Sequence, residues 1–148
     1  YIGRTFIMPS QEKRMDAVKM KLNPIKEIVS GRSVALVDDS IVRGTTLKEI
    51  VALVKKAGAR KVHLRITCPP VRAPCFYGVD MSAYGELIAN KKGVEEIRRY
   101  LGADSLAYIS LEGLKEAVGQ DICAGCLTGE YHTRFVSGMA EEAKRSGK

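Results

Sequence analysis

The segment SVALVDDSIVRGTT, residues 33–46, decides the fold class. Four apolar residues lead to two adjacent aspartates, Asp38 and Asp39, and Gly44 with two threonines follows after a short loop. A short apolar run rich in β-branched residues is typical of a buried parallel strand, so we predict one at Ser33–Val37. A helix is expected next, because a parallel strand needs a crossover connection to its neighbour.

The residues after this loop supply that connection. Apolar residues recur at helical spacing through residues 46–57, which predicts a helix, and Gly58 ends it. Residues 61–67, KVHLRIT, alternate between apolar and polar, which predicts a second strand. Its apolar side chains, expected on one face, are Val62, Leu64 and Ile66. Strand, helix and strand together form a βαβ unit, so the fold class is α/β.

The remaining elements are shorter and less regular. Residues 68–75 contain three prolines and are predicted to be irregular. The other expected elements are a basic helix over 10–22 capped by Ser10, a helix over 94–101, a strand over 106–109, a helix over 111–118 capped by Ser110, and a helical or frayed tail from Met139. The C-terminal third is therefore expected to be the more irregular part.

Length and composition narrow the class of protein. The chain has 148 residues, 45% of them hydrophobic, which fits one globular domain. No segment has the length and apolarity of a membrane span, and there is no secretory signal, so we expect a cytoplasmic protein. The net charge of +7 allows an anionic partner. Nucleic acid is not expected, since no nucleic-acid-binding motif and no Trp accompany the charge. A chain that does not begin with Met is expected to be a piece of a longer protein.

Asp38 and Asp39 are candidate ligand-binding residues. Ligands of open parallel sheets bind beyond the carboxyl ends of the strands, and two adjacent carboxylates there call for a cation or ligand hydroxyls. The following Arg43–Thr46 leads into a helix, whose free amides and dipole favour a phosphate, and Gly44 lets the backbone approach it. This arrangement indicates a ribose 5-phosphate. The alternative is an ordinary polar loop, whereas Walker A and dinucleotide-binding patterns are absent.

The four cysteines are the second candidate feature. In a chain without a secretory signal, close cysteine pairs indicate metal or redox chemistry more often than structural disulfides. The sequence CAGC, residues 123–126, fits half a zinc site, an iron–sulfur pair or a redox dithiol. A redox dithiol is the least favoured, because the segment does not follow a strand or open a helix.

These motifs together resemble a known family. VALVDDSIVRGTT looks like the motif that binds phosphoribosyl pyrophosphate (PRPP) in type I phosphoribosyltransferases. YIGRTFIMPSQEKR, MKLNPIKEIV, PCFYGVDM, ELIA, VEEIRRYLGADSL and GEY extend the resemblance to the glutamine PRPP amidotransferase family, iron–sulfur branch, over nearly the whole chain. The resemblance implies a parallel-sheet, type I phosphoribosyltransferase-like fold that is incomplete at its N-terminus and has an irregular C-terminal segment.

The resemblance also implies site residues. Asp38 and Asp39 would bind the ribose hydroxyls and a magnesium ion. The loop that follows would hold the 5-phosphate, largely through its amides. Residues 4–14 would be a mobile loop that closes over PRPP. The PRPP-binding residues after the aspartates are Ser40, Val42, Arg43, Gly44, Thr45 and Thr46; the mobile-loop residues are Arg4, Thr5, Lys13 and Arg14; and further bases near the pyrophosphate are Lys19 and Lys21.

For the cysteines, the resemblance implies a [4Fe–4S] cluster. Cys75, Cys123 and Cys126 match three ligand positions of the family, and the fourth ligand lies outside this chain. Cys68 matches none and is interpreted as a small buried hydrophobic residue. His63 and His132 are interpreted as ordinary strand and tail residues.

The implied protein is an amidotransferase that makes 5-phosphoribosylamine from PRPP and glutamine-derived ammonia, the first step of de novo purine synthesis. Residues 1–118 would be a partial phosphoribosyltransferase domain, with its PRPP loop at 34–46, and residues 119–148 a cysteine-containing segment and tail. The glutaminase part and the first strand would precede Tyr1, so the chain alone is expected to be inactive. Purine nucleotides and further copies of the protein are the expected partners. The alternatives are another PRPP-binding phosphoribosyltransferase and a non-catalytic regulator that senses PRPP.

Overall fold

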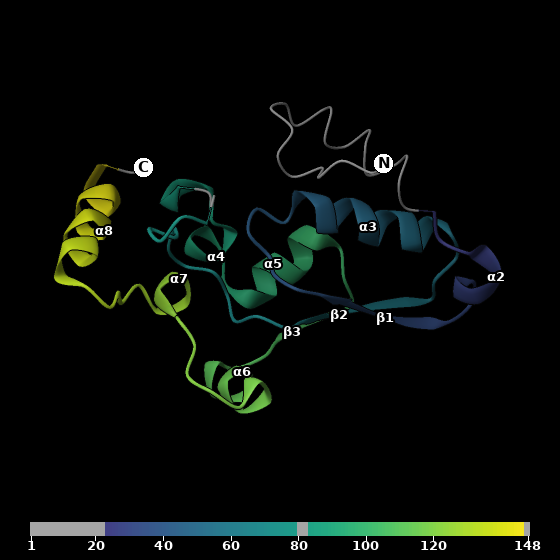
Figure 1. Cartoon of the computed structure of the whole chain (residues 1–148). Helices are drawn as coiled ribbons and strands as arrows, with labels where there is room; N and C mark the ends of the chain where they lie inside the picture. Colours follow the sequence, from purple (N-terminus) through teal and green to yellow (C-terminus); the bar gives the residue numbers. More distant parts are fainter. Residues whose placement is uncertain (1–22, 80–82, 147–148) are drawn as a thin grey trace, which may run out of the picture.

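The computed structural model describes residues 23–79 and 83–146, which contain a parallel sheet and several helices (Figure 1). The predicted helix over 10–22 and the mobile loop over 4–14 lie outside the described residues. In chain order the elements are α2 (Lys26–Val29), β1 (Ser33–Asp38), α3 (Thr45–Lys56), β2 (Lys61–Ile66), the 3₁₀ turn η2 (Tyr84–Glu86), α4 (Ile88–Lys91), α5 (Val94–Leu101), β3 (Ser105–Tyr108), α6 (Leu111–Val118), α7 (Gly125–Thr128) and α8 (Arg134–Ser146).

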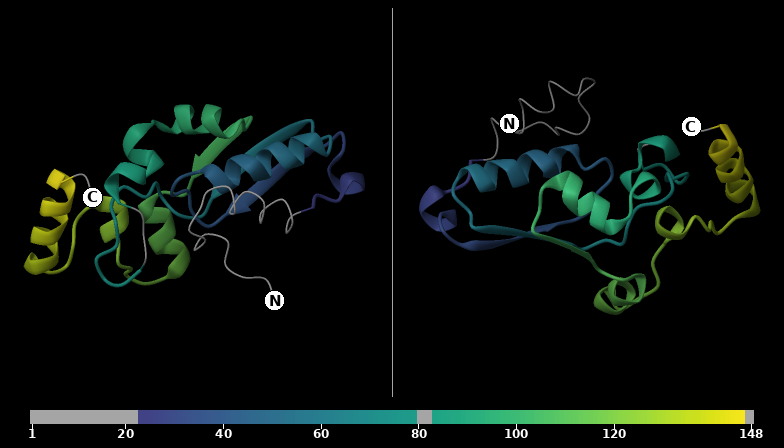
Figure 2. Two further views of the ribbon diagram at one scale, coloured as in Figure 1. Left: turned by 90° about the horizontal axis from the view of Figure 1, so that it is seen from above. Right: turned by 180° about the vertical axis from the view of Figure 1, so that it is seen from behind.

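The described residues form a three-stranded sheet in the order β1-β2-β3, and both pairs are parallel. Leu36 lies opposite Leu64, which lies opposite Leu106, so these apolar side chains share one face. Helices α3 and α5 lie on that face, whereas α6 lies beyond the end of β3 on the other side (Figures 1 and 2). The predicted βαβ unit is present, with α3 connecting β1 to β2.

The main core lies between the sheet and these two helices. Val62 and Leu64 of β2 are fully buried, as the alternation of residues 61–67 predicted, and Ile66 is nearly so. Burying a side chain of this size contributes roughly 1.5–3 kcal/mol. The helices contribute one apolar face each, with Leu47, Val51, Val54, Ile97 and Leu101.

Strand β1 differs from its prediction. It was expected to be buried, but its side chains alternate between half-buried and exposed, and Val37 is 70% exposed. The reason is position: β1 is an edge strand of the described sheet, and α3 and α5 cover only one face. The uncovered face carries Ala35 and Val37 of β1 with His63 and Arg65 of β2.

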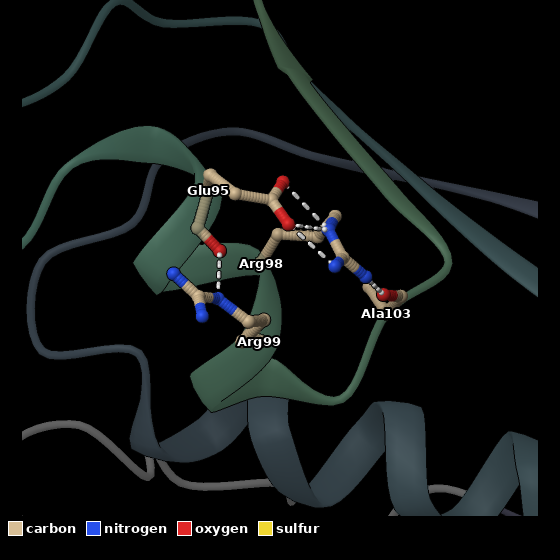
Figure 3. Close-up of polar contacts among 4 residues, drawn as sticks. All are labelled: Glu95, Arg98, Arg99 and Ala103. Carbon is tan, nitrogen blue, oxygen red and sulfur yellow. Dashed lines mark hydrogen bonds and ion pairs between the residues drawn. The ribbon is translucent and has the colours of Figure 1, made fainter.

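The corner between α5 and β3 is fixed by one arginine (Figure 3). Arg98 binds the Glu95 carboxylate with its Nε and Nη2, at 2.6–3.0 Å, and donates from Nη1 to the Ala103 carbonyl at 2.6 Å. The next residue, Asp104, accepts a 2.8 Å hydrogen bond from the Val62 amide and lies 3.4 Å from the Lys55 ammonium. Those partners hold the pKa of Asp104 below its usual value. The corner thus sets β3 against β2.

A second, smaller core lies beyond the carboxyl ends of the strands. Its buried residues are Val71, Leu87 and Leu127, which come from three distant parts of the chain. Val42, Cys68 and half-buried residues of α6 and α7 pack against them. Helix α6 begins as predicted, with Ser110 Oγ accepting from the Gly113 amide at 3.0 Å.

The predicted helices and strands within the described residues are otherwise present, with ends that differ by a residue or two except for α8, which begins at Arg134. Four-residue α2, α4 and α7 were not predicted, because such short elements carry no periodicity. In the part of the chain that is described, no helix has the length and apolarity to cross a bilayer.

Candidate functional site

Asp38 and Asp39 stand at the carboxyl end of β1, where the sequence placed them. The Asp39 amide donates to Asp38 Oδ1 at 3.0 Å, and the Ser40 amide donates to Asp39 Oδ1 at 2.7 Å. The Asp38 carbonyl accepts a 3.0 Å hydrogen bond from the Thr67 amide, which anchors the pair to the segment after β2. Partial burial, helped by the neighbouring Asp39 charge, raises the pKa of Asp38 above its ordinary value. A cation or hydroxyl donor bound at this pair would stabilise the two negative charges.

Helix α3 starts six residues later with a bare N-terminus. Gly44 precedes it with φ of 76° and no side-chain cap, and the first turn contains no acidic residue. The Lys48 amide donates the first helical hydrogen bond to the Gly44 carbonyl at 3.0 Å. The amides of residues 45–47 therefore have no acceptor within the helix, and they lie at the positive end of its dipole. This is the chemistry of an anion site.

The loop between the aspartates and α3 is held from one side by residues 84–91. The Ile88 amide donates to the Val42 carbonyl at 2.9 Å, and Arg43 forms a 2.7 Å ion pair with Glu86. A Cβ on Gly44 would lie 3.2 Å from Ile88 Cδ1, so the loop packs against α4. The Val42 side chain packs against the second core, and the Arg43 side chain pairs with Glu86, so both side chains are engaged within the protein.

Glu86 and Ile88 are site-supporting residues that sequence reasoning did not assign. They belong to the ELIA motif, which contributes to the family resemblance but carries no role of its own in the sequence. The ELIA motif could be recognised in the sequence, but its spacing does not indicate that it contacts a loop more than 40 residues earlier.

The cysteine segments come together, although they are about 50 residues apart. The Cys126 carbonyl accepts hydrogen bonds from the amides of Arg72 and Ala73 at 2.9 and 3.0 Å. The Tyr131 hydroxyl donates to the Pro74 carbonyl at 2.6 Å, and its ring meets Phe76 edge-on at 5.3 Å. PCFYG and CAGCLTGEY therefore form one region of the structure.

The thiols of this region interact. Burial raises the pKa of Cys126, and the nearby Cys75 and Cys123 raise it further. Burial also raises the pKa of Cys68, with smaller contributions from Cys126 and Asp39. All four cysteines are free. Within residues 23–79 and 83–146, no three His, Cys, Asp or Glu side chains are arranged to hold a metal ion.

The two histidines have structural surroundings. His63 Nδ1 lies 2.8 Å from Ser105 Oγ on the uncovered face of the sheet. The His132 amide donates to the Tyr77 hydroxyl at 3.1 Å, and its side chain is exposed. Neither lies in the loop after β1. The predicted residues Arg4, Thr5, Lys13 and Arg14, with Lys19 and Lys21, lie outside the described residues.

Comparison with known proteins gives a consistent result. The chain is 51% identical, over 99% of its length, to an amidophosphoribosyltransferase of Methanothermobacter thermautotrophicus, and 56% identical, over 90% of its length, to that of Methanocaldococcus jannaschii. It spans only 32% and 28% of these relatives. No family model matches the chain.

The solved structures agree. Glutamine PRPP amidotransferase from Bacillus subtilis, in complex with ADP and GMP, superposes with a TM-score of 0.75 at 48% identity. The match covers 90% of this chain and 31% of that one. The expectation of a parallel-sheet, type I phosphoribosyltransferase-like fold is thereby confirmed.

Proposed function

We propose that this chain is the PRPP-binding part of an amidophosphoribosyltransferase, the enzyme that makes 5-phosphoribosylamine from PRPP and glutamine-derived ammonia at the start of purine synthesis. The observation that carries the proposal is the pairing of Asp38 and Asp39 with the bare N-terminus of α3, at one strand end of the sheet. The comparisons support the proposal, because the chain is 51% and 56% identical to two relatives named amidophosphoribosyltransferase.

Each end of the site has its own task. Asp38 and Asp39 bind the two ribose hydroxyls. They would also hold a magnesium ion, which would supply positive charge to offset that of the departing pyrophosphate. Residues 40–46 hold the 5-phosphate through the amides at the start of α3 and the hydroxyls of Thr45 and Thr46. Val42 and Arg43 contribute main-chain groups, because their side chains are turned to the second core and to Glu86.

The reaction asks for positioning more than for a catalytic acid or base. Pyrophosphate leaves C1 of the ribose, and ammonia attacks the same carbon through a transition state with oxocarbenium character. Holding both ends of the ribose phosphate fixes C1 relative to both groups, and fixed dipoles stabilise the developing charge. The mobile-loop residues Arg4, Thr5, Lys13 and Arg14 exclude water in this proposal.

Cys75, Cys123 and Cys126 are proposed to hold a [4Fe–4S] cluster whose fourth ligand lies outside this chain. The proximity of their two segments, joined by the hydrogen bonds from Arg72 and Ala73 to the Cys126 carbonyl, supports this. Thiolates are the usual ligands of such clusters. Cys68 is not included, because it matches none of the ligand positions that the resemblance implies. The two alternative functions, a different phosphoribosyltransferase or a PRPP sensor, leave this paired cysteine region without a role.

Purine nucleotides are proposed as regulators, since the similar Bacillus subtilis structure contains ADP and GMP. The proposal also includes self-association and a cytoplasmic location.

The test of the PRPP site uses the full-length product of the gene that encodes this chain. Asp38→Asn with Asp39→Asn is expected to lower PRPP-dependent pyrophosphate release by at least about 100-fold, because such electrostatic contacts carry the reaction. Glutamine hydrolysis measured without PRPP should be retained. Glu116→Gln, on the exposed face of α6, is the matched control and should leave both activities unchanged. Normal PRPP turnover in the double variant would contradict the assignment.

The test of the cluster is chemical. The full-length gene product, purified anaerobically, should be brown and contain iron and acid-labile sulfide. Cys126→Ser should lose both, whereas Cys68→Ser should keep them. Colourless wild-type protein, or equal loss in the two variants, would refute this ligand set.

A further inference from the structure

Residues 84–91, which comprise η2 and α4, contact two regions that the proposed function treats separately. On one side they hold the loop after β1, through Ile88 to Val42 and Glu86 to Arg43. On the other side Asn90, in the last turn of α4, reaches the irregular segment after β2. Its Nδ2 donates to the Arg72 carbonyl at 2.8 Å and to the Tyr84 carbonyl at 3.3 Å.

The Arg72 segment is in turn bonded to the cysteine region. The amides of Arg72 and Ala73 both donate to the Cys126 carbonyl, at 2.9 and 3.0 Å. A continuous series of hydrogen bonds therefore runs from Cys126 to Arg72, then through Asn90 to α4, and from Ile88 to Val42. Apart from Asn90, every polar partner in this series is a main-chain group, so Asn90 is its only side-chain link.

Packing follows the same route. Leu87, between η2 and α4, is fully buried and shares the second core with Val71 and Leu127. Val42 packs on that core from the loop, and Cys126 packs on it from α7. Gly44 completes the contact, because a Cβ there would approach Ile88, Leu101 and Tyr100 within 3.2–3.4 Å. A displacement of α4 would therefore move the start of α3.

We propose that residues 84–91 form a clamp that positions the 40–46 loop relative to the cysteine region, and that Asn90 is the positioning residue at its centre. The inference rests on the proposed function in that the 40–46 loop is taken as the phosphate loop. The clamp itself depends only on the contacts above. The clamp gives the cysteine region a role in PRPP binding. Ordering of the cysteine region favours ordering of the 40–46 loop, and ordering of the loop favours ordering of the cysteine region to the same extent.

The first measurement is amide hydrogen exchange on the full-length gene product, without ligand. Asn90→Ala and Asn90→Asp both remove the two donors, and Asn90→Asp keeps the size of the side chain. Exchange across residues 40–46 should become about three- to tenfold faster in both, the loss expected for one or two exposed hydrogen bonds. Lys92→Ala, at an exposed position directly after the clamp, is the control and should leave the loop unchanged.

The second measurement concerns PRPP. The KM for PRPP should rise about three- to tenfold in both Asn90 variants, and kcat should change less than about twofold. This pattern is expected when binding of the substrate and binding of the transition state are weakened equally. In the wild type, PRPP should slow exchange at the Arg72 and Ala73 amides as well as in the loop. In the Asn90 variants that protection should be confined to the loop.

The outcomes separate the two proposals. Unchanged loop exchange and unchanged KM in both Asn90 variants would overturn the clamp and leave the proposed function intact. Faster exchange to the same extent in β2 would also overturn it, because the effect would then be global. A third outcome is that the wild type shows no PRPP-dependent turnover, while exchange across residues 40–46 is still faster in the Asn90 variants. This result would refute the proposed function and support the clamp.

Discussion

The loop after β1 and the cysteine region are built in opposite ways. Residues 38–46 are contiguous, and the hydrogen bonds of the two aspartate carboxylates join immediate neighbours. The cysteine region is assembled from remote segments: Tyr131 bonds to Pro74, 57 residues earlier, and His132 bonds to Tyr77, 55 residues earlier. Chemistry that lies within one loop can be read from a short motif, whereas chemistry assembled over a distance depends on the packing that brings its parts together.

The largest expected effect concerns the loop. Gly44→Ala should lower the free energy of unfolding by about 2–4 kcal/mol, since φ of 76° is unfavourable for a side chain and the new Cβ meets Ile88 and Leu101. Gly102→Ala is the matched control, with φ of 72° and open space, and should cost about 1 kcal/mol. Denaturant titration of the 148-residue chain measures both. Equal costs would show that the packing against α4 and α5 is unimportant.

The next effect concerns the cysteine region. An added Cβ at Gly125 would lie 2.8 Å from the ring of Tyr131, whose hydroxyl is tied to Pro74. Gly125→Ala should therefore cost about 2 kcal/mol of stability by overpacking, measured by the same denaturant titration.

Gly138→Ala in α8 is the corresponding control, because a Cβ added there would meet no atom within 4 Å. It should raise stability by up to about 1 kcal/mol through helix propensity. If Gly125→Ala were as well tolerated, the ring of Tyr131 would not be fixed in this position.

Two tyrosines offer a pair of opposite sign. Tyr131→Phe removes the 2.6 Å hydrogen bond to the Pro74 carbonyl and should lower stability by about 1 kcal/mol. The buried hydroxyl of Tyr108 has no hydrogen-bond partner among the described residues, and burial raises its pKa to about 12. Tyr108→Phe should therefore raise stability by about 1 kcal/mol. Thermal unfolding of both variants and the wild type shows whether each substitution raises or lowers stability. Lower stability in Tyr108→Phe would contradict the expectation that its hydroxyl lacks a hydrogen-bond partner.

The smallest effect concerns Asp38 alone. Its pKa is raised in the folded chain, so the folded state holds more protons than the unfolded state between the two pKa values. Stability must then fall as the pH rises from 3.8, the ordinary value, through the raised one. Asp38→Asn removes this fall and should be more stable than the wild type near neutral pH by about 0.5 kcal/mol, after allowance for solvent screening.

The measurement is the difference in unfolding free energy between Asp38→Asn and the wild type, across pH and without magnesium. Exposed Asp121→Asn should show no such gain near neutral pH, because Asp121 pairs with Lys115. A difference for Asp38→Asn that is flat with pH would mean that the carboxylate pair is not strained.

The same contrast explains how far the sequence could predict the structure. Helices α3, α5 and α6 and strand β2 carry strong periodicity or clear caps, and their prediction was correct within a residue or two. The position of Asp38 and Asp39 at a strand end was predicted for the same reason. The burial predicted for β1 was wrong, because burial depends on which elements cover the sheet rather than on the strand itself. The contacts of Glu86, Ile88 and Asn90 were not predicted either, since they join elements of three or four residues to distant loops.

The edge that β1 forms in the described part of the sheet has a practical consequence for preparing this chain. Among the described residues β1 pairs only with β2, and it presents Val37, 70% exposed, beside an unpaired row of main-chain groups. Such edges recruit strands from other molecules, which natural proteins prevent with charges or covering elements. At high concentration the isolated chain should therefore self-associate through β1, and a charged residue in place of Val37 is the substitution of choice for keeping it in solution.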